Sequence, residues 1–320
     1  MAYSQEVMNR ARARLAEARA DRESENREHL QQAYRKVPRL QEIDRQLRLT
    51  MAKAAQAAFV QGGDVQEMMQ EARRENLLLQ QERAELAALY FEEGYLDEIP
   101  ICSHCGGEGY VGSTMCECLQ ELCRQEQKKE LTLLSGGKEN FSQFRLEYYS
   151  DEVNPRLGIS PRAVMERTLR TCRAYAAEFD MGSESLLFSG NTGLGKTFLS
   201  ACIARSVADR GYSVVYETAS RMFTQMERAR FSGDEDARRE TEKYTQCDLM
   251  IIDDLGTEML TSFVQSAFYQ LVNGRLMTGK KTIINTNLKL EELGQRYGAQ
   301  VLSRIEGEYQ RLPFIGEDIR

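Results

Sequence analysis

Apolar residues in the first third of the chain recur with the spacing of an α-helix. A first stripe comprises Val37, Leu40, Ile43, Leu47, Met51, Ala54 and Ala58, and a second comprises Val65, Met69, Ala72, Leu79, Leu86 and Tyr90. Gaps of three and four residues place most members of each stripe on one helix face. Gly62 and Gly63, between the stripes, are typical of a turn. Residues 1–95 are therefore expected to form two or three helices, packed as a hairpin or a short coiled coil.

The last part of the chain, residues 136–320, has a different pattern. Short apolar runs, such as 185–188, 249–252 and 282–284, alternate with longer stretches of helical spacing. Apolar runs of this length are typical of buried strands, and their alternation with helices indicates a parallel sheet built from βαβ units. An α/β domain is expected here.

Composition and charge limit the class of protein. The 320 residues are 42% hydrophobic and 28% charged, which is enough apolar material for folded domains and excludes a wholly disordered chain. The net charge of −7 argues against a globally basic nucleic-acid coat protein, although a local basic stripe is still compatible with it. No apolar run reaches the ~18 residues that span a bilayer, and the charged N-terminus lacks the apolar core of a signal peptide. The protein is expected to be cytoplasmic, with no membrane partner.

A glycine-rich loop follows the apolar run 185–188. Residues 190–197 read Gly-Asn-Thr-Gly-Leu-Gly-Lys-Thr, and a helical apolar stripe follows. Strand, G-x-x-x-x-G-K-T and helix in this order indicate a phosphate-binding loop, in which glycines let backbone N–H groups approach the phosphates. Lys196 is expected to contact the β- and γ-phosphates of ATP, and the Thr197 hydroxyl Mg²⁺. The predicted ATP contacts are Gly190, Asn191, Thr192, Gly193, Leu194, Gly195, Lys196, Thr197 and Phe198.

Polar side chains follow the later apolar runs. Asp253 and Asp254 end the run 249–252, where Asp253 is expected to hold the Mg²⁺ shell and Asp254 to activate the attacking water. Asn287 comes just after 282–284, at a strand tip from which it is expected to position that water. Arg304 is expected on a helix before the last strand, projecting into a neighbouring subunit's ATP site. The alternatives are a pair of helix-capping acids, a plain strand end and a solvated arginine.

Five of the eight cysteines lie between residues 102 and 123. Pairs of cysteines at short spacing are typical of structural zinc sites, and glycines between the pairs let the backbone fold around the metal. Cys102, Cys105, Cys116 and Cys118 are the predicted zinc ligands, with Cys123 in reserve and His104 not a ligand. Free thiols are the alternative. The chain is thus expected to divide into a helical partner-docking region (1–95), a zinc knuckle (96–135) and an ATPase domain (136–320).

These motifs together resemble the AAA+ ATPases, and within them the bacterial helicase-loader and IstB-like group, the DnaC and DnaI types. The matching segments are 190–199, 251–258 (Ile-Ile-Asp-Asp-Leu-Gly-Thr-Glu), 273–276 (Asn-Gly-Arg-Leu) and 284–288 (Ile-Asn-Thr-Asn-Leu). The lead-in from Phe141 to Ser150 also resembles this group. The cysteine pairs followed by a helix are similar to its Gram-positive branch. The resemblance covers residues 140–320 closely.

The resemblance implies a five-stranded parallel sheet of AAA+ order, flanked by helices and lacking a C-terminal lid. It makes Asp253 and Asp254 the Walker B pair, Asn287 the sensor-1 residue and Arg304 an arginine finger that acts in trans. Arg275 is a further candidate for the subunit interface. It also implies a weak ATPase, stimulated by assembly or by DNA. A stretch with Arg221, Arg228, Arg230, Arg238, Arg239, Lys243, Phe223 and Phe231 is either a single-stranded DNA groove or an ordinary solvated face.

The function that the resemblance implies is an ATP-dependent loader of the replicative DNA helicase. Such a protein uses ATP, Mg²⁺ and Zn²⁺, binds single-stranded DNA and the hexameric helicase, and self-associates through its ATP sites during replication initiation or restart. The alternative within the group is an IstB-like ATP-binding helper of a transposase. A small-molecule P-loop kinase and an adaptor with a degenerate ATPase are more distant alternatives, disfavoured by Asn287 and Arg304 and by the intact Lys196, Asp253 and Asp254 respectively. The N-terminal helices are either a solvated stalk or the docking module for the partner.

Overall fold

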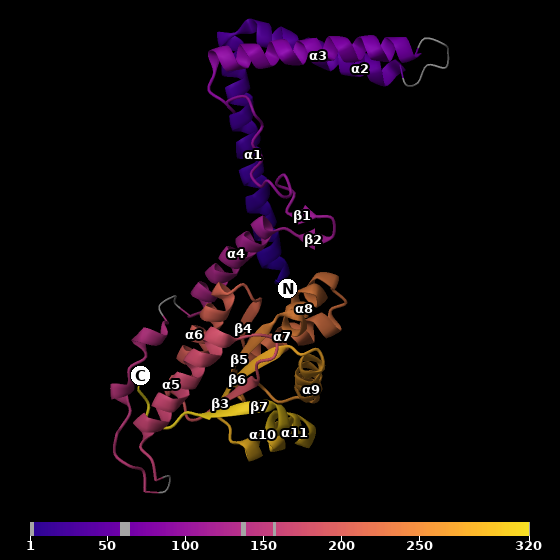
Figure 1. Ribbon diagram of the computed structural model, residues 1–320. Helices are drawn as coiled ribbons and strands as arrows, with labels where there is room; N and C mark the ends of the chain where they lie inside the picture. Colours follow the sequence, from indigo (N-terminus) through magenta and orange to yellow (C-terminus); the bar gives the residue numbers. More distant parts are fainter. Residues whose placement is uncertain (1–2, 58–64, 136–138, 156–157, 320) are drawn as a thin grey trace. The chain divides into compact units, whose positions relative to one another are not determined.

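The computed structural model describes residues 3–57, 65–135, 139–155 and 158–319 (Figure 1). The chain forms two compact units, one of Arg14–Thr114 and one of Met1–Ala13 with Met115–Arg320. The boundary at residue 114 falls inside the predicted zinc knuckle, and residues 1–13 belong with the second unit. The three functional regions expected from the sequence stay a prediction, because compactness does not test what each region does.

The N-terminal region is helical, as expected. Its elements are α1 (Gln5–Lys36), α2 (Pro38–Ala57) and α3 (Val65–Tyr90), and α2 and α3 pack along each other as a hairpin. Val37, Leu40 and Ile43 of the first stripe are buried, as is Leu79 of the second, whereas Met69 and Tyr90 are exposed. The predicted turn at Gly62 and Gly63 lies outside the described residues.

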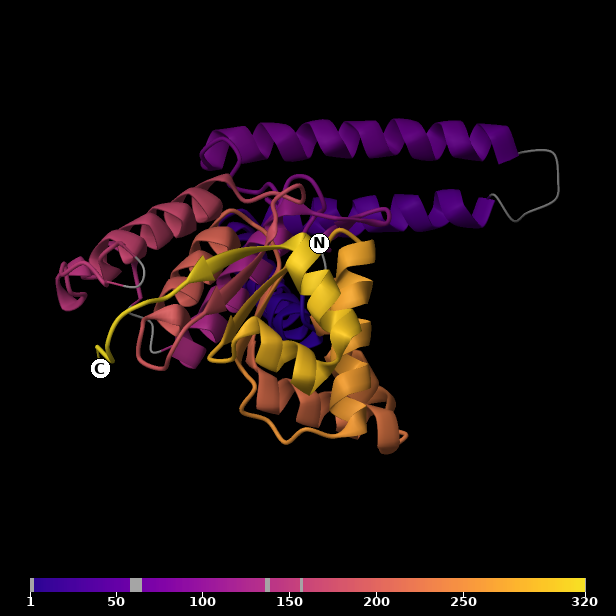
Figure 2. The same ribbon diagram turned by 90° about the horizontal axis from the view of Figure 1, so that it is seen from below.

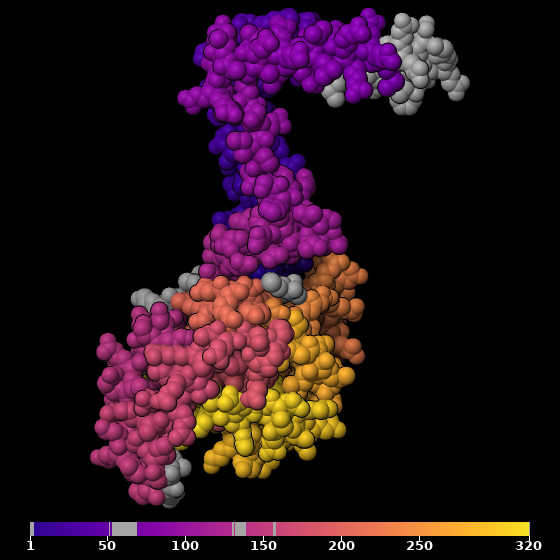
Figure 3. Space-filling model, viewed as in Figure 1, coloured from indigo at the N-terminus to yellow at the C-terminus, as the bar shows by residue number. Residues whose placement is uncertain are grey.

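Polar contacts fix the pairing of the two hairpin helices. The Arg39 guanidinium donates two hydrogen bonds to the Glu82 carboxylate at 2.7 and 2.8 Å, and Arg83 donates to Asp44 at 2.8 Å. Exposed leucines occur on α3, with Leu77 and Leu78 54% and 62% exposed, so part of the hairpin surface is apolar. The space-filling view shows α2 and α3, in violet and purple, packed against each other (Figure 3).

A five-stranded parallel sheet forms the centre of the larger unit, which confirms the predicted fold. Its strands are β3 (Ser185–Ser189), β4 (Val214–Thr218), β5 (Leu249–Leu255), β6 (Lys281–Thr286) and β7 (Tyr309–Pro313), in the spatial order β4-β5-β6-β3-β7. The helices are α5 (Pro161–Glu178), α6 (Lys196–Asp209), α7 (Ala219–Phe231), α8 (Glu235–Gln246), α9 (Ser262–Met277), α10 (Leu290–Tyr297) and α11 (Ala299–Glu308). The described residues after β7 contain no helix.

Alternate side chains of each strand enter two separate cores. Ile251 and Ile283 pack with residues of α5 and α6, whereas Ile252 and Ile284 pack with residues of α7, α9, α10 and α11. Because successive side chains of a strand point to opposite faces, a strand that is apolar at every position needs cover on both. The helices lie accordingly on the two sides of the sheet (Figures 1 and 2).

Helix α4 (Glu117–Ser135) covers the open edge of the sheet. Strand β4 is the outermost strand on that side, and the buried Gln127 of α4 bonds with both ends of its side-chain amide to β4 and to the segment just before it. Its Nε2 donates to the Tyr212 carbonyl at 3.0 Å, and its Oε1 accepts from the Val214 N–H at 3.1 Å. The amide of Gln127 thus stands where a neighbouring strand would offer a peptide group.

The first turns of α1 pack on the same helix. Val7 and Ala11 are buried, and the Arg10 guanidinium donates to the Glu126 carboxylate at 3.2 Å. Short elements complete the chain: β1 (Tyr110–Val111), β2 (Thr114–Met115) and the 3₁₀ turns η1 (Phe141–Gln143) and η2 (Leu146–Tyr148). Within the described residues, no helix combines the length and apolar character needed to cross a membrane.

Candidate nucleotide site

The glycine-rich loop lies between β3 and α6, as the sequence predicts. Gly190, Gly193 and Gly195 have φ values of 154°, 74° and 83°, a region that favours glycine. A Cβ at Gly190 would lie 2.2 Å from the Phe314 carbonyl oxygen, so this position leaves no room for a side chain. The loop therefore packs closely on the segment after β7 and exposes its other side.

The ammonium group of Lys196 is held inside this loop. Its Nζ donates to the carbonyl oxygens of Gly190 and Asn191 at 2.7 Å each and to Asn287 Oδ1 at 2.7 Å. The side chain is 6% exposed. Lys196 and Asn287, which the sequence places far apart, thus meet because β3 and β6 are neighbours that end at the same edge.

Asp253 accepts hydrogen bonds from three other side chains of the site. Its Oδ1 accepts from the Thr197 hydroxyl at 3.2 Å and from Asn285 Nδ2 at 2.8 Å, and its Oδ2 accepts from the Tyr216 hydroxyl at 2.8 Å. The predicted Thr197–Asp253 pair is therefore in contact. Tyr216 and Asn285 were not among the predicted residues; their positions one or two residues before the ends of β4 and β6 are the only signal that the sequence offers for them.

Asp254 differs from its neighbour in both backbone and exposure. Its φ is 54°, the one positive value at a non-glycine position among the described residues, and its side chain is exposed. Asp254 lines the same cleft as Lys196 and Asn287. A left-handed aspartate costs about 1 kcal/mol or more, and such conformations cluster at functional sites.

The loop after Asp254 is fixed by a buried carboxylate. Glu258 Oε2 accepts from the Gly256 N–H at 2.9 Å, and its Oε1 accepts from the Tyr297 hydroxyl and from Arg296. Arg296 and Tyr297 lie at the end of α10, two turns after Asn287. Glu258 therefore ties the segment that follows β5 to the segment that follows β6.

A cleft of about 610 Å³ opens along the glycine-rich loop. Volumes of roughly 300–1,000 Å³ are usual for small-molecule sites. The opposite wall comes from the lead-in segment, with Phe144, Arg145 and Tyr148, and Ile319 contributes from beyond β7. Two hydrogen bonds seat these segments: the Tyr149 hydroxyl donates to the Leu194 carbonyl at 3.0 Å, and the Ile319 N–H to the Gly193 carbonyl at 3.1 Å.

The two candidate interface arginines have opposite environments. Arg304 is exposed on α11 and does not line the cleft, so the structure leaves its predicted action in trans as an expectation. Arg275 is 1% exposed, and its guanidinium donates to Thr282 Oγ1 at 3.0 Å and to the Tyr244 carbonyl at 2.8 Å. The suggestion that Arg275 faces another subunit is therefore wrong, because its side chain is buried and forms its hydrogen bonds inside the domain.

Three of the six basic residues of the stretch on α7 and α8 lie close to acids. Arg221 lies 3.6 Å from Glu217, and Arg228 lies 3.6 Å from Asp234. Of the two aromatic residues, Phe223 is buried in the core, where no base can stack on it. Phe231 is 70% exposed. These contacts favour a solvated face over a single-stranded DNA groove.

The donor set at Asp253 fits a magnesium ion. A carboxylate and a hydroxyl at the end of a phosphate loop are the oxygen ligands that Mg²⁺ takes in nucleotide sites. The fully buried Asn285 Oδ1, close to Asp253 through the same amide, has no hydrogen-bond partner among the described residues. An acceptor without a partner is expected at a site where a bound nucleotide would bring a metal ion and its waters.

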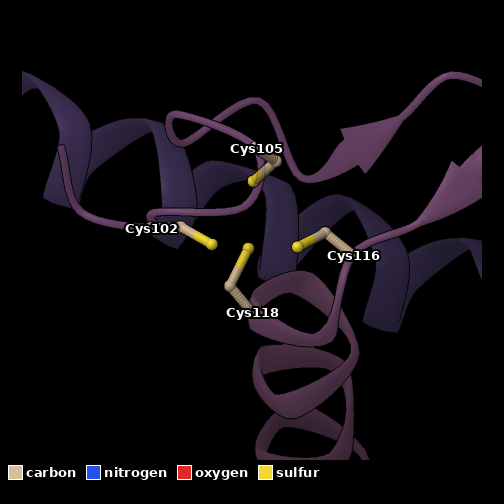
Figure 4. Close-up of side chains that lie close together, drawn as sticks. All are labelled: Cys102, Cys105, Cys116 and Cys118. Carbon is tan, nitrogen blue, oxygen red and sulfur yellow. The ribbon is translucent and has the colours of Figure 1, made fainter.

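The four predicted zinc ligands come together. The sulfur atoms of Cys102, Cys105, Cys116 and Cys118 all lie within 4.8 Å of one another and point toward a common centre (Figure 4). Tetrahedral zinc with Zn–S distances of ~2.3 Å separates its sulfurs by about 3.8 Å, so the cluster fits the ion. Gly106 and Gly107, with φ of 63° and 98°, turn the chain after Cys105.

The other candidate ligands lie elsewhere. Cys123 is on α4, as expected, but it is buried beside the Met8 sulfur at 3.7 Å and outside the cluster. Burial raises the pKa of its thiol to about 11, which keeps it protonated and a poor metal ligand. His104 is exposed and is not part of the cluster.

Part of the chain is similar to known proteins. The model of the IstB-like ATP binding protein family matches residues 157–305. The replicative helicase loader DnaC of Escherichia coli K12 is 28% identical over 137 residues, which are 43% of this chain and 56% of that protein. A Mycobacterium tuberculosis protein, described as ATP-binding in an insertion sequence, is 29% identical over 146 residues, 46% of this chain and 54% of that protein. The match thus spans about half the length of these relatives.

Solved structures were also compared. A DnaC helicase loader structure covers 55% of this chain and 98% of its own, at 21% identity and a TM-score of 0.45. A DnaI structure covers 58% of this chain and 94% of its own, at 17% identity and a TM-score of 0.46. The family match includes the glycine-rich loop, Asp253, Asp254, Asn287 and Arg304. Residues 157–305 thus match the IstB-like ATP binding protein family, and part of the chain is similar to the DnaC helicase loaders.

Proposed function

We propose that the protein is an ATP-dependent loader of a replicative DNA helicase. The observation that carries this proposal is the site at the carboxyl ends of β3, β5 and β6, where Lys196, Asp254 and Asn287 line one cleft of a DnaC-like domain. A phosphate-binding loop next to a pair of acidic residues is typical of sites that hydrolyse ATP. ATPases of this kind act on a partner molecule, and the similarity to helicase loaders favours a hexameric helicase as that partner.

Each residue of the cleft has a role in this proposal. The loop 190–197 and Lys196 bind the phosphates, and Phe198 and the lead-in wall hold the rest of the nucleotide. Thr197 and Asp253 hold Mg²⁺, which neutralises charge on the phosphates when bound. Asp254 accepts a proton from the attacking water, and Asn287 orients that water beside the γ-phosphate. Lys196 leaves Asn287 for the phosphates as nucleotide enters.

Hydrolysis is expected to be weak in the isolated protein. Arg304 is exposed and outside the cleft of its own chain, which suits a residue that completes a neighbour's site. Arginine fingers supply about 10³–10⁵ in rate in other NTPases. Self-association through ATP sites, promoted by single-stranded DNA or by the helicase, would then raise the turnover.

The N-terminal hairpin is proposed to dock the helicase. Leu77 and Leu78 of α3 are more than half exposed, and apolar side chains on a helix surface are typical anchors for a partner. The cysteine cluster is proposed to bind zinc in a closed site of four thiolates. Such a site supplies folding energy to a short glycine-rich segment that has little core of its own.

Capture of partners from the native host tests this function. Full-length protein carrying Asp254→Ala, which should hold ATP without hydrolysing it, is used as bait with ATP present, and the bound proteins are identified by mass spectrometry. The replicative helicase is the expected partner. Leu77→Asp with Leu78→Asp should abolish its capture, whereas Met277→Asp, an 80% exposed position on α9, should not. If all variants capture the helicase equally well, the hairpin is not part of the binding interface.

A transposase helper is the second candidate, because the matching family is IstB-like and one similar protein belongs to an insertion sequence. In that case the bait recovers a transposase without helicase, and double-stranded DNA rather than single-stranded DNA stimulates ATP hydrolysis.

A further inference from the structure

Two side chains that contact Asp253 have no role in the proposed ATP chemistry. Tyr216, on β4, donates from its hydroxyl to Asp253 Oδ2, and Asn285, on β6, donates from its amide to Asp253 Oδ1, each at 2.8 Å. A third residue, Ser200 of α6, contacts both of them, at 3.1 Å from the Tyr216 hydroxyl and 2.8 Å from Asn285 Nδ2. These two side chains thus hold the Asp253 carboxylate from β4 and β6, and Ser200 connects them to each other.

The orientation of the Asn285 amide follows from its neighbours. The ionised Asp253 carboxylate only accepts hydrogen bonds, so the NH₂ group of Asn285 must face it. The amide oxygen consequently points elsewhere, and although Asn285 is fully buried, this oxygen has no partner among the described residues. An unsatisfied buried acceptor costs about 1–3 kcal/mol. It therefore marks a place for a donor that arrives with a ligand.

Tyr216 holds the other carboxylate oxygen of Asp253. A carboxylate only accepts hydrogen bonds, so the phenol hydroxyl is the donor in this contact. It also fixes which carboxylate oxygen remains toward the phosphate loop, because Oδ2 is engaged on the side of β4.

We propose that Tyr216 and Asn285 are positioning residues that hold Asp253 for the nucleotide-bound Mg²⁺, and that Asn285 Oδ1 accepts a hydrogen bond from a water of that ion. This rests on the proposed ATP function. Mg²⁺ demands near-ideal octahedral geometry and keeps several waters, so a carboxylate fixed in advance and a nearby acceptor both favour it. Partners of this kind behind metal ligands are typically worth 10–100-fold in metal affinity.

Nucleotide binding at controlled Mg²⁺ separates this role from a structural one. The full-length protein is titrated with a fluorescent ATP analogue, first in EDTA and then at increasing Mg²⁺. Tyr216→Phe and Asn285→Leu should each raise the Mg²⁺ concentration at half-saturation at least tenfold and leave the affinity in EDTA within about twofold. Ser200→Ala is the matched control, because it removes a contact of both residues but none of Asp253, and should shift the Mg²⁺ midpoint less than threefold.

Several outcomes would overturn the proposal. Unchanged Mg²⁺ midpoints in both variants would do so, as would an equal shift in Ser200→Ala. If Asn285→Leu fails to fold, Tyr216→Phe decides alone, since it removes a single hydroxyl. With Mn²⁺ in place of Mg²⁺, the proton ENDOR signals of metal-bound water should change in Asn285→Leu and not in Tyr216→Phe. If the spectra of Asn285→Leu and of the wild type are identical, the proposed hydrogen bond from water to Asn285 is wrong.

Failure of the proposed function looks different. Wild-type protein that binds no nucleotide, with or without Mg²⁺, would overturn both proposals. Wild-type protein that binds Mg–ATP normally, with variants that also do so, would overturn only the roles of Tyr216 and Asn285.

Discussion

Replacing Arg275 with alanine should unfold the ATPase domain at a markedly lower temperature without removing its nucleotide site. The guanidinium donates to four oxygen acceptors, Thr282 Oγ1 and the carbonyl oxygens of Tyr244, Cys247 and Lys281, and also to Cys247 Sγ. These groups belong to the end of α8, the residue after it, and the start of β6. The arginine therefore joins three elements at the edge of the sheet opposite the cleft.

The magnitude follows from those four bonds. A buried acceptor that loses its donor costs about 1–3 kcal/mol, so at the low end Arg275→Ala removes about 4 kcal/mol. A domain of 150–250 residues loses about 2–4 °C of Tm for each kcal/mol, which predicts a fall of roughly 10 °C. Arg275→Lys should fall by about half as much, because an ammonium reaches fewer of the acceptors.

Thermal unfolding followed by circular dichroism measures this change, and nucleotide binding at 10 °C shows whether the folded variant keeps its site. Arg304→Ala is the matched control, since it removes an exposed arginine and should move Tm by less than about 2 °C. If Arg275→Ala unfolds at the wild-type temperature yet hydrolyses no ATP, Arg275 acts at a subunit interface and the reasoning from its burial is refuted.

Four other predictions concern the site and its surroundings. Lys196→Ala should lower nucleotide affinity more than tenfold in a fluorescence titration, because the loop loses its only predicted phosphate cation. Arg304→Ala should bind ATP normally and lose about 10³-fold or more in hydrolysis; a 1:1 mixture with Asp254→Ala protein should regain activity, and a mixture as inactive as its parts would contradict action in trans. Cys118→Ser should cut the zinc content measured by mass spectrometry from one ion per chain to well below one, with ATP binding retained. Burial alone would raise the pKa of Asp248, but hydrogen bonds from Lys280 and Ser213 outweigh it and hold that pKa below its usual range. Stability from Asp248 is thus present above pH ~4 and lost as the pH falls further, so Asp248→Asn should lower Tm at pH 7 and show a smaller fall between pH 5 and 3.

Local patterns carried most of the correct predictions. The loop 190–197, the acids near the end of β5 and the apolar runs are each readable within about ten residues, and the strand order followed from family resemblance. The cysteine cluster was also predictable, because all four ligands lie within one short segment. In each case the residues that act together are also close together in the sequence.

The missed features depend on which elements become neighbours. Tyr216 and Asn285 meet Asp253 only because β4 and β6 flank β5, and nothing in their own segments signals that contact. Arg275 was misjudged for a similar reason. An arginine in the last turn of a helix is usually solvated, but here that turn packs on the start of β6 and the end of α8. The unit boundary at residue 114 likewise depends on packing that the sequence pattern does not reveal.

The amide of Gln127 has a consequence for how the protein behaves in concentrated solution. An outer strand with free peptide groups is a template on which another molecule can add a strand, and such addition leads to aggregation. Gln127 occupies the Val214 N–H and the Tyr212 carbonyl, and α4 covers the strand beside them. Loosening of α4 would uncover that edge. The solubility of the ATPase domain is therefore expected to depend on a helix that contributes no residue to its nucleotide cleft.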